Sequence, residues 1–214
     1  MKQCNYLKHL ILLVLCAITF NVTAHEFEAV NSDGVTIWYN ITSYNTAEVT
    51  YPSEYSGEYS GEVNIPSTVE YSGNTYSVIT IGDHAFQACD GLTSVVIPEG
   101  VTSIGYAAFA QCGGLTSVTI PEGVTSIEYY AFKDCDGLTS VVIPESVTSI
   151  GSYYAFYNCT GLTEIEVAEG NINYSSEDGV LFNKYKTELI QYPIGNSRTS
   201  YSIPEGVTTI AMIL

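Results

Sequence analysis

The sequence predicts an α/β, strand-rich solenoid, a right-handed and curved stack of coils with a β-rich N-terminal cap. Residues 81–149 contain three consecutive copies of one 23-residue pattern. A fourth copy begins at Ile150 and carries one extra residue before its Ala-Phe pair. A fixed period of this length is typical of solenoids, in which each unit buries its neighbour's apolar face.

Each copy divides into strands and corners. In one copy, residues 92–97 alternate as a strand should, with every second side chain pointing inward. Pro98 ends this strand because it cannot donate a ladder hydrogen bond. Residues 101–104 are a second β-prone run, which predicts another wall. Residues 107–112 have room for only one or two helical turns.

Stacking of the copies in register turns each repeat position into a column. The columns are Phe86, Phe109, Phe132 and Phe156; Leu92, Leu115, Leu138 and Leu162; and Ile81, Ile104, Ile127 and Ile150. Neighbouring strands lie ~4.8 Å apart, so equivalent residues should touch from coil to coil. Burial of each such side chain contributes roughly 1.5–3 kcal/mol, so several coils are needed for a stable fold.

Residues 1–24 have the pattern of a signal peptide. Lys2 and Lys8 precede an apolar run over residues 10–20, and small residues lead to a cleavage site after Ala24. The run is too short to span a bilayer as an anchor. We therefore expect a secreted or cell-surface protein without a membrane span after cleavage.

The chain beyond Ala24 is strongly acidic. It keeps four of the six Lys and Arg residues and all 23 acidic residues, so its formal net charge is 4 − 23 = −19. Such a chain repels phosphate backbones and anionic membranes, which excludes nucleic acid as a partner.

Residues 25–60 lack the repeat and predict the N-terminal cap. Phe27–Val30, Val35–Ile41 and Ala47–Tyr51 read as strands, with Asp33-Gly34 as a hairpin turn. A cap of this kind covers the first coil of a solenoid.

Residues 61–214 are predicted to form the solenoid, with two hairpin insertions. The first covers residues 70–77, and the second covers residues 171–201 with β-prone runs at 180–182 and 189–192. Residues 203–210 resume the repeat. The pattern stops at Leu214 without a recognisable cap, which favours a truncated C-terminus over an edge covered by a partner.

The repeated motif LTSVxIPxxVTSIGxxAFxxC resembles the leucine-rich repeats of BspA-like bacterial surface proteins. The resemblance covers Gly61 to the C-terminus and, more loosely, Phe27 to Ser60. It implies a leucine-rich-repeat solenoid on an exported protein, of a kind often associated with adhesion.

Four cysteines remain after the signal peptide, and they follow the repeat: Cys89, Cys112, Cys135 and Cys159. An exported chain with four cysteines suggests disulfides. However, parallel side chains in one column hold their sulfur atoms poorly for the required dihedral angle, and a straight ladder does not converge on zinc. We therefore expect buried free thiols.

An acidic column follows the strands: Glu99, Glu122, Glu145 and Glu169. It could bind calcium weakly between coils, or it could be a solvated edge. We favour the solvated edge because no carbonyl or Asn ligands converge there, and we expect no metal and no cofactor.

The outward positions of the strands form the candidate binding face. Its two rows are Ser94, Ser117, Ser140 and Glu164, and then Val96, Thr119, Val142 and Glu166. These small, flat side chains suit a broad contact with a protein, such as a host matrix protein or another bacterial surface protein. The tyrosines before each Ala-Phe pair fit a recognition surface and a coil edge equally well: Tyr106, Tyr129, Tyr130, Tyr153 and Tyr154.

Catalysis has little support in the sequence. Only His25 and His84 remain beyond the signal peptide, and His84 stands at a variable repeat position that predicts a surface location. No phosphate loop or metal spacing is present. We therefore predict a non-enzymatic protein-binding or adhesion module of unknown oligomeric state; the alternatives are a glycan-binding module, which needs aromatic platforms, and an architectural surface component.

Overall fold

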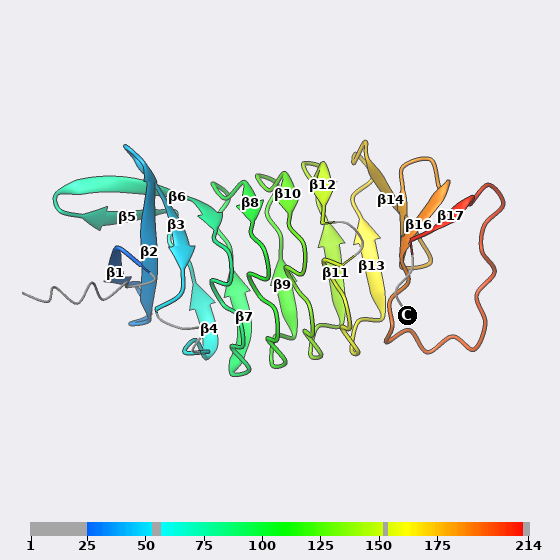
Figure 1. Ribbon diagram of the computed structural model, residues 1–214, viewed down its shortest axis with the longest axis horizontal. Coiled ribbons are helices and arrows are strands. Elements are labelled where there is room, and N and C mark those ends of the chain that lie inside the picture. Colours follow the sequence, from blue (N-terminus) through cyan, green and yellow to red (C-terminus); the bar gives the residue numbers. More distant parts are fainter. Residues whose placement is uncertain (1–24, 53–56, 152–153, 212–214) are drawn as a thin grey trace, which may run out of the picture.

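The computed structural model describes residues 25–52, 57–151 and 154–211, so the predicted signal peptide lies outside the described residues. The chain winds as successive coils along the long axis of the molecule, from the blue N-terminal strands to the red C-terminal segment (Figure 1). This arrangement confirms the strand-rich repeat solenoid.

The first wall of the solenoid takes one strand from each coil. Its strands are β4 (Gly61–Asn64), β7 (Leu92–Val96), β9 (Ser117–Thr119), β11 (Ser140–Ile143) and β13 (Glu164–Val167). β4, β7 and β9 pair in parallel, as do β11 and β13. Val95 of β7 lies opposite Val118 of β9, which is the equivalent residue of the next coil. The strands therefore stack in the register that the 23-residue period predicts.

The second wall is also parallel. It consists of β3 (Thr46–Thr50), β6 (Asn74–Ile81), β8 (Ser103–Ile104), β10 (Ser126–Ile127) and β12 (Ser149–Ile150). A threonine beside these strands adds a bond between coils. Thr102, Thr125 and Thr148 each donate through Oγ1 to a carbonyl oxygen of the preceding coil, at 3.1 to 3.2 Å. The threonine that recurs at this position of each repeat therefore forms a column of hydrogen bonds between coils.

The phenylalanine column forms the centre of the core, as predicted. Phe86, Phe109, Phe132 and Phe156 are buried and stack with ring centroids 4.9, 5.2 and 5.4 Å apart and nearly parallel planes. Tyr59 lies 4.5 Å from Phe86 and covers the N-terminal end of the column. Each ring thus buries the face of the next.

The helical turns expected at residues 107–112 are wrong, and the described residues contain no helix. Ala107 and Gln111 have positive φ angles of 51° and 62°. The N–H groups of Ala107, Phe109 and Gln111 donate to carbonyl oxygens of the next coil, while those between them bond within their own coil. In a helix, these N–H groups would all point along the helix axis, toward carbonyl oxygens of the same helix. Bonding between coils therefore replaces helical bonding here.

The cysteines are buried free thiols, as predicted. The Sγ atoms of Cys112, Cys135 and Cys159 lie 2.9 to 3.0 Å from the carbonyl oxygens of Phe86, Phe109 and Phe132, one coil back. The thiol therefore packs as an apolar group and also gives the buried carbonyl a second donor.

The N-terminal strands extend the second wall. β1 (Phe27–Val30), β2 (Thr36–Ser43) and β3 are antiparallel, and β3 then pairs in parallel with β6 of the first coil. Residues 68–81 form the first inserted hairpin, in which β5 (Thr68–Tyr71) pairs with β6. Ser72 and Gly73 connect them with φ angles of 50° and 79°, which fits a type I′ turn.

The second insertion is a larger sheet at the C-terminal end. β14 (Tyr174–Glu177), β15 (Val180–Asn183) and β16 (Glu188–Gln191) are antiparallel, and β17 (Thr209–Ile210) pairs in parallel with β16. The expected β15–β16 hairpin is present, whereas β14 was not predicted. Within residues 203–210 the only strand is β17, which corresponds to the second-wall strand of the earlier repeats.

A buried asparagine marks the start of this insertion. Asn171 stands where the preceding coils have a buried valine, Val124 or Val147. Its Nδ2 donates to the carbonyl oxygens of Pro144 and Val147 at 2.8 and 3.0 Å, and its Oδ1 accepts from two backbone N–H groups of residues 173 and 174. Because all these bonds are made, the buried amide fixes the chain that enters β14.

Phe109→Ala tests the column. Because the ring is fully buried between two others, we expect the free energy of unfolding to fall by roughly 3–5 kcal/mol in urea denaturation. Tyr185→Ala is the control, since Tyr185 is 86% exposed and its truncation should leave the midpoint nearly unchanged. Equal effects of the two substitutions would contradict the buried column.

The thiols predict a dependence of stability on pH. Desolvation by burial raises the pKa of Cys89 from 9.0 to about 11 and that of Cys159 to about 12, and it also raises the pKa of Cys112 and Cys135. Above pH 9 the unfolded chain loses thiol protons that the folded chain keeps. The free energy of unfolding should therefore be level below pH 9 and fall as the pH rises toward 11, by at most ~1.4 kcal/mol per pH unit for each thiol.

Urea denaturation at each pH measures this effect. A chain with Cys112→Ala and Cys135→Ala should lose stability less steeply between pH 9 and 10, whatever its stability at neutral pH. Identical slopes for the two chains would show that these thiols ionise equally in the folded and unfolded states.

Candidate functional site

The candidate binding face lies on the first wall, and its residues are in register. Ser94 is opposite Ser117, and Val96 is opposite Thr119. Farther along, Ser140 is opposite Glu164, and Val142 is opposite Glu166. The strand ladder is interrupted between β9 and β11, so the face consists of two paired segments of one wall (Figure 1).

The side chains of this face point to solvent, as the alternation predicts. Val96 and Val142 are 49% and 57% exposed, whereas the inward neighbour Val95 is 4% exposed. Ser94 is half-buried, and the remaining five predicted residues are exposed. The result is a surface with two exposed valines and two carboxylates at its C-terminal end.

The inserted sheet ends this face. The N–H of Ile165 donates to the carbonyl oxygen of Gly179 at 2.8 Å, so the β14–β15 turn lies directly beside β13. A Cβ atom at Gly179 would come within 2.8 Å of the Cβ of Glu164, and the φ of this glycine is 77°. Glycine therefore allows the turn to close the first wall.

The tyrosines before the Ala-Phe pairs form a continuous ridge along one coil edge. Tyr106 and Tyr129 stack with centroids 6.2 Å apart, and Tyr129 lies 4.7 Å from Tyr154. A hydrogen bond to Tyr130 raises the pKa of Tyr129 to about 12. Tyr106 is exposed and Tyr129 and Tyr154 are half-buried, so the ridge packs as a coil edge and still presents ring surface to solvent. Tyr153 lies outside the described residues.

His84 was predicted to lie on the surface, but its side chain packs partly against neighbouring rings. It is half-buried, with its ring centroid 5.1 Å from that of Tyr106 and 6.5 Å from that of Tyr51. Its φ is 60°, and its N–H donates to the carbonyl oxygen of Tyr106 in the next coil. The histidine thus belongs to the N-terminal end of the tyrosine ridge.

The acidic column is solvent-exposed at all four positions: Glu99, Glu122, Glu145 and Glu169. Over the described ranges, His, Cys, Asp and Glu side chains form no group of three or more that could hold a metal ion. No helix in those ranges has the length and hydropathy of a membrane span.

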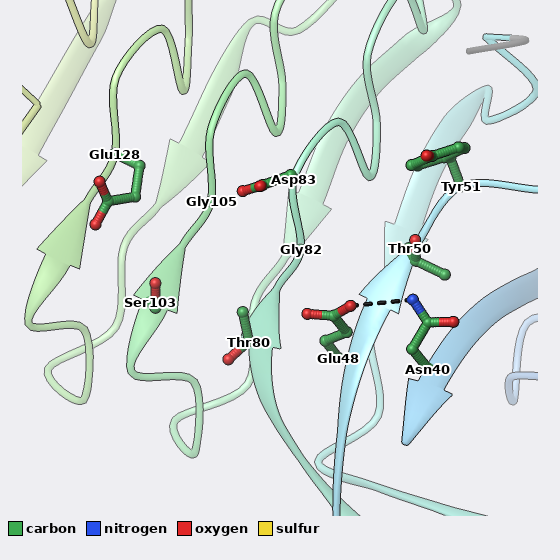
Figure 2. A pocket seen from close by; sticks show the side chains of 10 residues that line it. All are labelled: Asn40, Glu48, Thr50, Tyr51, Thr80, Gly82, Asp83, Ser103, Gly105 and Glu128. Atoms are coloured by element: carbon green, nitrogen blue, oxygen red, sulfur yellow. Dashed lines mark hydrogen bonds between the residues drawn. The ribbon is translucent and has the colours of Figure 1, made fainter. Parts of the chain in front are cut away.

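The second wall carries a polar groove of about 310 Å³ that the sequence analysis missed (Figure 2). The residues that line it come from the N-terminal segment of β2 and β3 and from three coils: Asn40, Glu48, Thr50, Tyr51, Thr80, Gly82, Asp83, Ser103, Gly105 and Glu128. Its floor is a cross-strand row in which Glu48 lies opposite Thr80, and Thr80 lies opposite Ser103.

The groove could not be found from the repeat alone, because the N-terminal segment of β2 and β3 supplies one end of it. One signal was present in the repeat. Glu128 occupies the position that is glycine in the other three copies, Gly82, Gly105 and Gly151. A Cβ atom at Gly82 would lie 2.7 Å from the carbonyl oxygen of Val49, so close stacking favours glycine there.

Solved structures with the same architecture include three bacterial proteins. The chain is 20% identical to the pneumococcal vaccine antigen PcpA, with a TM-score of 0.59 over 88% of this chain and 61% of that one. It is 29% identical to a leucine-rich repeat protein of Bacteroides capillosus, with a TM-score of 0.55 over 67% and 99% of the two chains. A leucine-rich repeat protein of Eubacterium ventriosum is 26% identical, with a TM-score of 0.53 over 86% and 56%.

This chain thus spans 61% and 56% of the length of two of these proteins. No curated protein matches it. The family model of the BspA type leucine rich repeat region matches residues 79–203 in six copies, which is more than half of the 214 residues. Its match includes the coils with the stacked phenylalanines and strands β14 to β16 of the inserted sheet. The chain belongs to the BspA-type leucine-rich repeat family.

Proposed function

We propose that this chain is a non-enzymatic binding module of the cell surface or the secreted fraction, and that it holds a protein partner on its first wall. The observation that carries the proposal is the exposure of the side chains at one repeat position, Val96, Thr119 and Val142, in the strands of the first wall. Two exposed β-branched apolar residues on a rigid wall suit contact with another protein surface.

The shape of the wall supports a broad and shallow contact. A standard protein interface buries ~1,200–2,000 Å² in total, which requires many small contacts where no deep cleft is present. The walls are held by hydrogen bonds between coils, so little conformational entropy is lost when a partner binds. Display of several copies on one surface would add avidity.

The charge of the chain favours a neutral or basic partner. The formal net charge beyond residue 24 is 4 − 23 = −19, and Glu164 and Glu166 bring two of these charges onto the face itself. Complementary charge speeds association and suppresses acidic competitors. Host matrix proteins and other bacterial surface proteins are the partner classes we propose. The signal-peptide pattern of residues 1–24 supports export of the chain.

Two other functions remain as alternatives for this chain. A glycan-binding role of the first wall would need aromatic platforms, and its outward rows consist of Ser, Thr, Val and Glu. An architectural surface component without a soluble ligand needs no binding face at all.

Charge placed on the first wall tests the proposal. The full chain is first screened against host matrix proteins, bacterial surface proteins and glycans, and the dissociation constant of the strongest protein partner is measured. Thr119→Lys and Val142→Lys should each raise it roughly tenfold or more, because a bulky charge disrupts the flat apolar contact.

Ser149→Lys is the matched control, because Ser149 is an exposed strand residue of the second wall. All three variants should keep the unfolding midpoint, since the substituted side chains are exposed. A partner that binds all three variants equally well would show that the first wall is not the binding face.

A further inference from the structure

The polar groove on the second wall has two distinct ends. Figure 2 shows Tyr51 at one end and Glu128 at the other, with Glu48 and Asp83 between them. Gly82 and Gly105 also line the space between the ends. The carboxylates lean over these glycines: a Cβ at Gly105 would lie 2.6 Å from Oδ1 of Asp83.

The carboxylates of the groove are held in place by local donors. Oε1 of Glu48 accepts from Nδ2 of Asn40 at 3.0 Å, and Oδ1 of Asp83 accepts from the N–H of Tyr106 at 2.7 Å. Each carboxylate has room for further donors, since two oxygens offer about four acceptor sites. The groove therefore presents ordered acceptors to a ligand.

The floor adds hydroxyl groups beside these acceptors. Ser103 accepts a hydrogen bond from Ser126 at 3.1 Å, so its own O–H can be donated to a ligand. Thr80 lies opposite Ser103 in the adjacent strand. A ligand with both donors and acceptors can donate to the carboxylates and accept from the hydroxyls side by side. Ligand hydroxyl groups do both, whereas ammonium and guanidinium groups only donate.

The residues that line the groove disfavour apolar and anionic ligands. Pockets for apolar small molecules are lined mainly by apolar and aromatic side chains, and in this groove only the Tyr51 ring offers such a surface. The three carboxylates Glu48, Asp83 and Glu128 repel phosphate, sulfate and carboxylate groups. Together with the hydroxyl groups of the floor, this lining favours a neutral, hydroxyl-rich ligand with one apolar face to lie against the tyrosine.

Glu128 is the residue that the fold itself does not require. Its N–H donates to Ile104 O at 2.8 Å, as the N–H of Gly105 donates to Ile81 O one coil earlier. The backbone is therefore the same, but only this copy carries a side chain at a position where stacking favours glycine. That side chain closes one end of the groove.

We propose that this groove binds a neutral saccharide, either a monosaccharide or one unit of a neutral oligosaccharide. Glu48, Asp83 and Glu128 accept from its hydroxyl groups, Ser103 donates to it, and Tyr51 packs against its C–H face. This inference goes beyond the proposed protein-binding function, because the groove lies on the second wall and shares no residue with the candidate binding face.

A glycan array tests the proposal with the full chain, using neutral, sialylated and sulfated oligosaccharides together with a Lys-rich peptide. We expect binding of neutral oligosaccharides only. In calorimetry with the strongest of them, Glu128→Gly should raise the dissociation constant roughly tenfold or more, since a hydrogen bond to a charged acceptor is lost. Because glycine restores the repeat pattern, this variant should fold.

Glu122→Gln is the control, as it removes one exposed carboxylate of the acidic column and should leave saccharide affinity unchanged. Val142→Lys should also leave it unchanged, which separates this site from the protein-binding face. The proposal is overturned if no neutral oligosaccharide binds, if only the Lys-rich peptide binds, or if Glu128→Gly binds the saccharide as tightly as the natural chain.

Discussion

Hydrogen bonds that run from one coil to the next set the spacing on which the whole structure depends. They cross on both strand walls and again at the turns, where Phe109 donates to Ala131 and Phe132 donates to Ala155. This spacing brings equivalent side chains into contact, so the phenylalanine rings stack and the cysteine thiols reach the carbonyl oxygens one coil back. The turns accept positive φ at non-glycine residues because these bonds hold them.

Much of this fold could be predicted from the period and the alternation of apolar residues. The columns, the two walls and the outward rows follow from a 23-residue repeat and a two-residue strand period. The turn at residues 107–112 could not, because its alanines favour a helix and the competing bonds come from the next coil. β14 was also missed, since its Tyr-Ser-Ser-Glu sequence has no apolar alternation and its entry is fixed by a buried asparagine.

The two surfaces differ in how far the sequence predicts them. Each coil presents the same outward strand positions on the first wall, so the alternation of the repeat predicts that Val96 and Val142 point outward, and both are exposed. The groove joins Glu48 and Tyr51 of the N-terminal strands to Glu128, about 80 residues later, through a parallel pairing of β3 with β6. No local sequence pattern predicts that pairing. The only sign of the groove in the repeat is Glu128, which stands where the other copies have glycine.

Deletion of one coil tests most directly whether register holds the molecule together. Removal of residues 104–126 joins Ser103 to Ile127 and leaves every column aligned, because it removes one full period of 23 residues. This shortened chain should still unfold in one cooperative transition, whereas a chain that lacks residues 104–123 should lose cooperative unfolding because its columns are displaced. If the two deletions gave the same unfolding curve, stacking in register would not be what stabilises the fold.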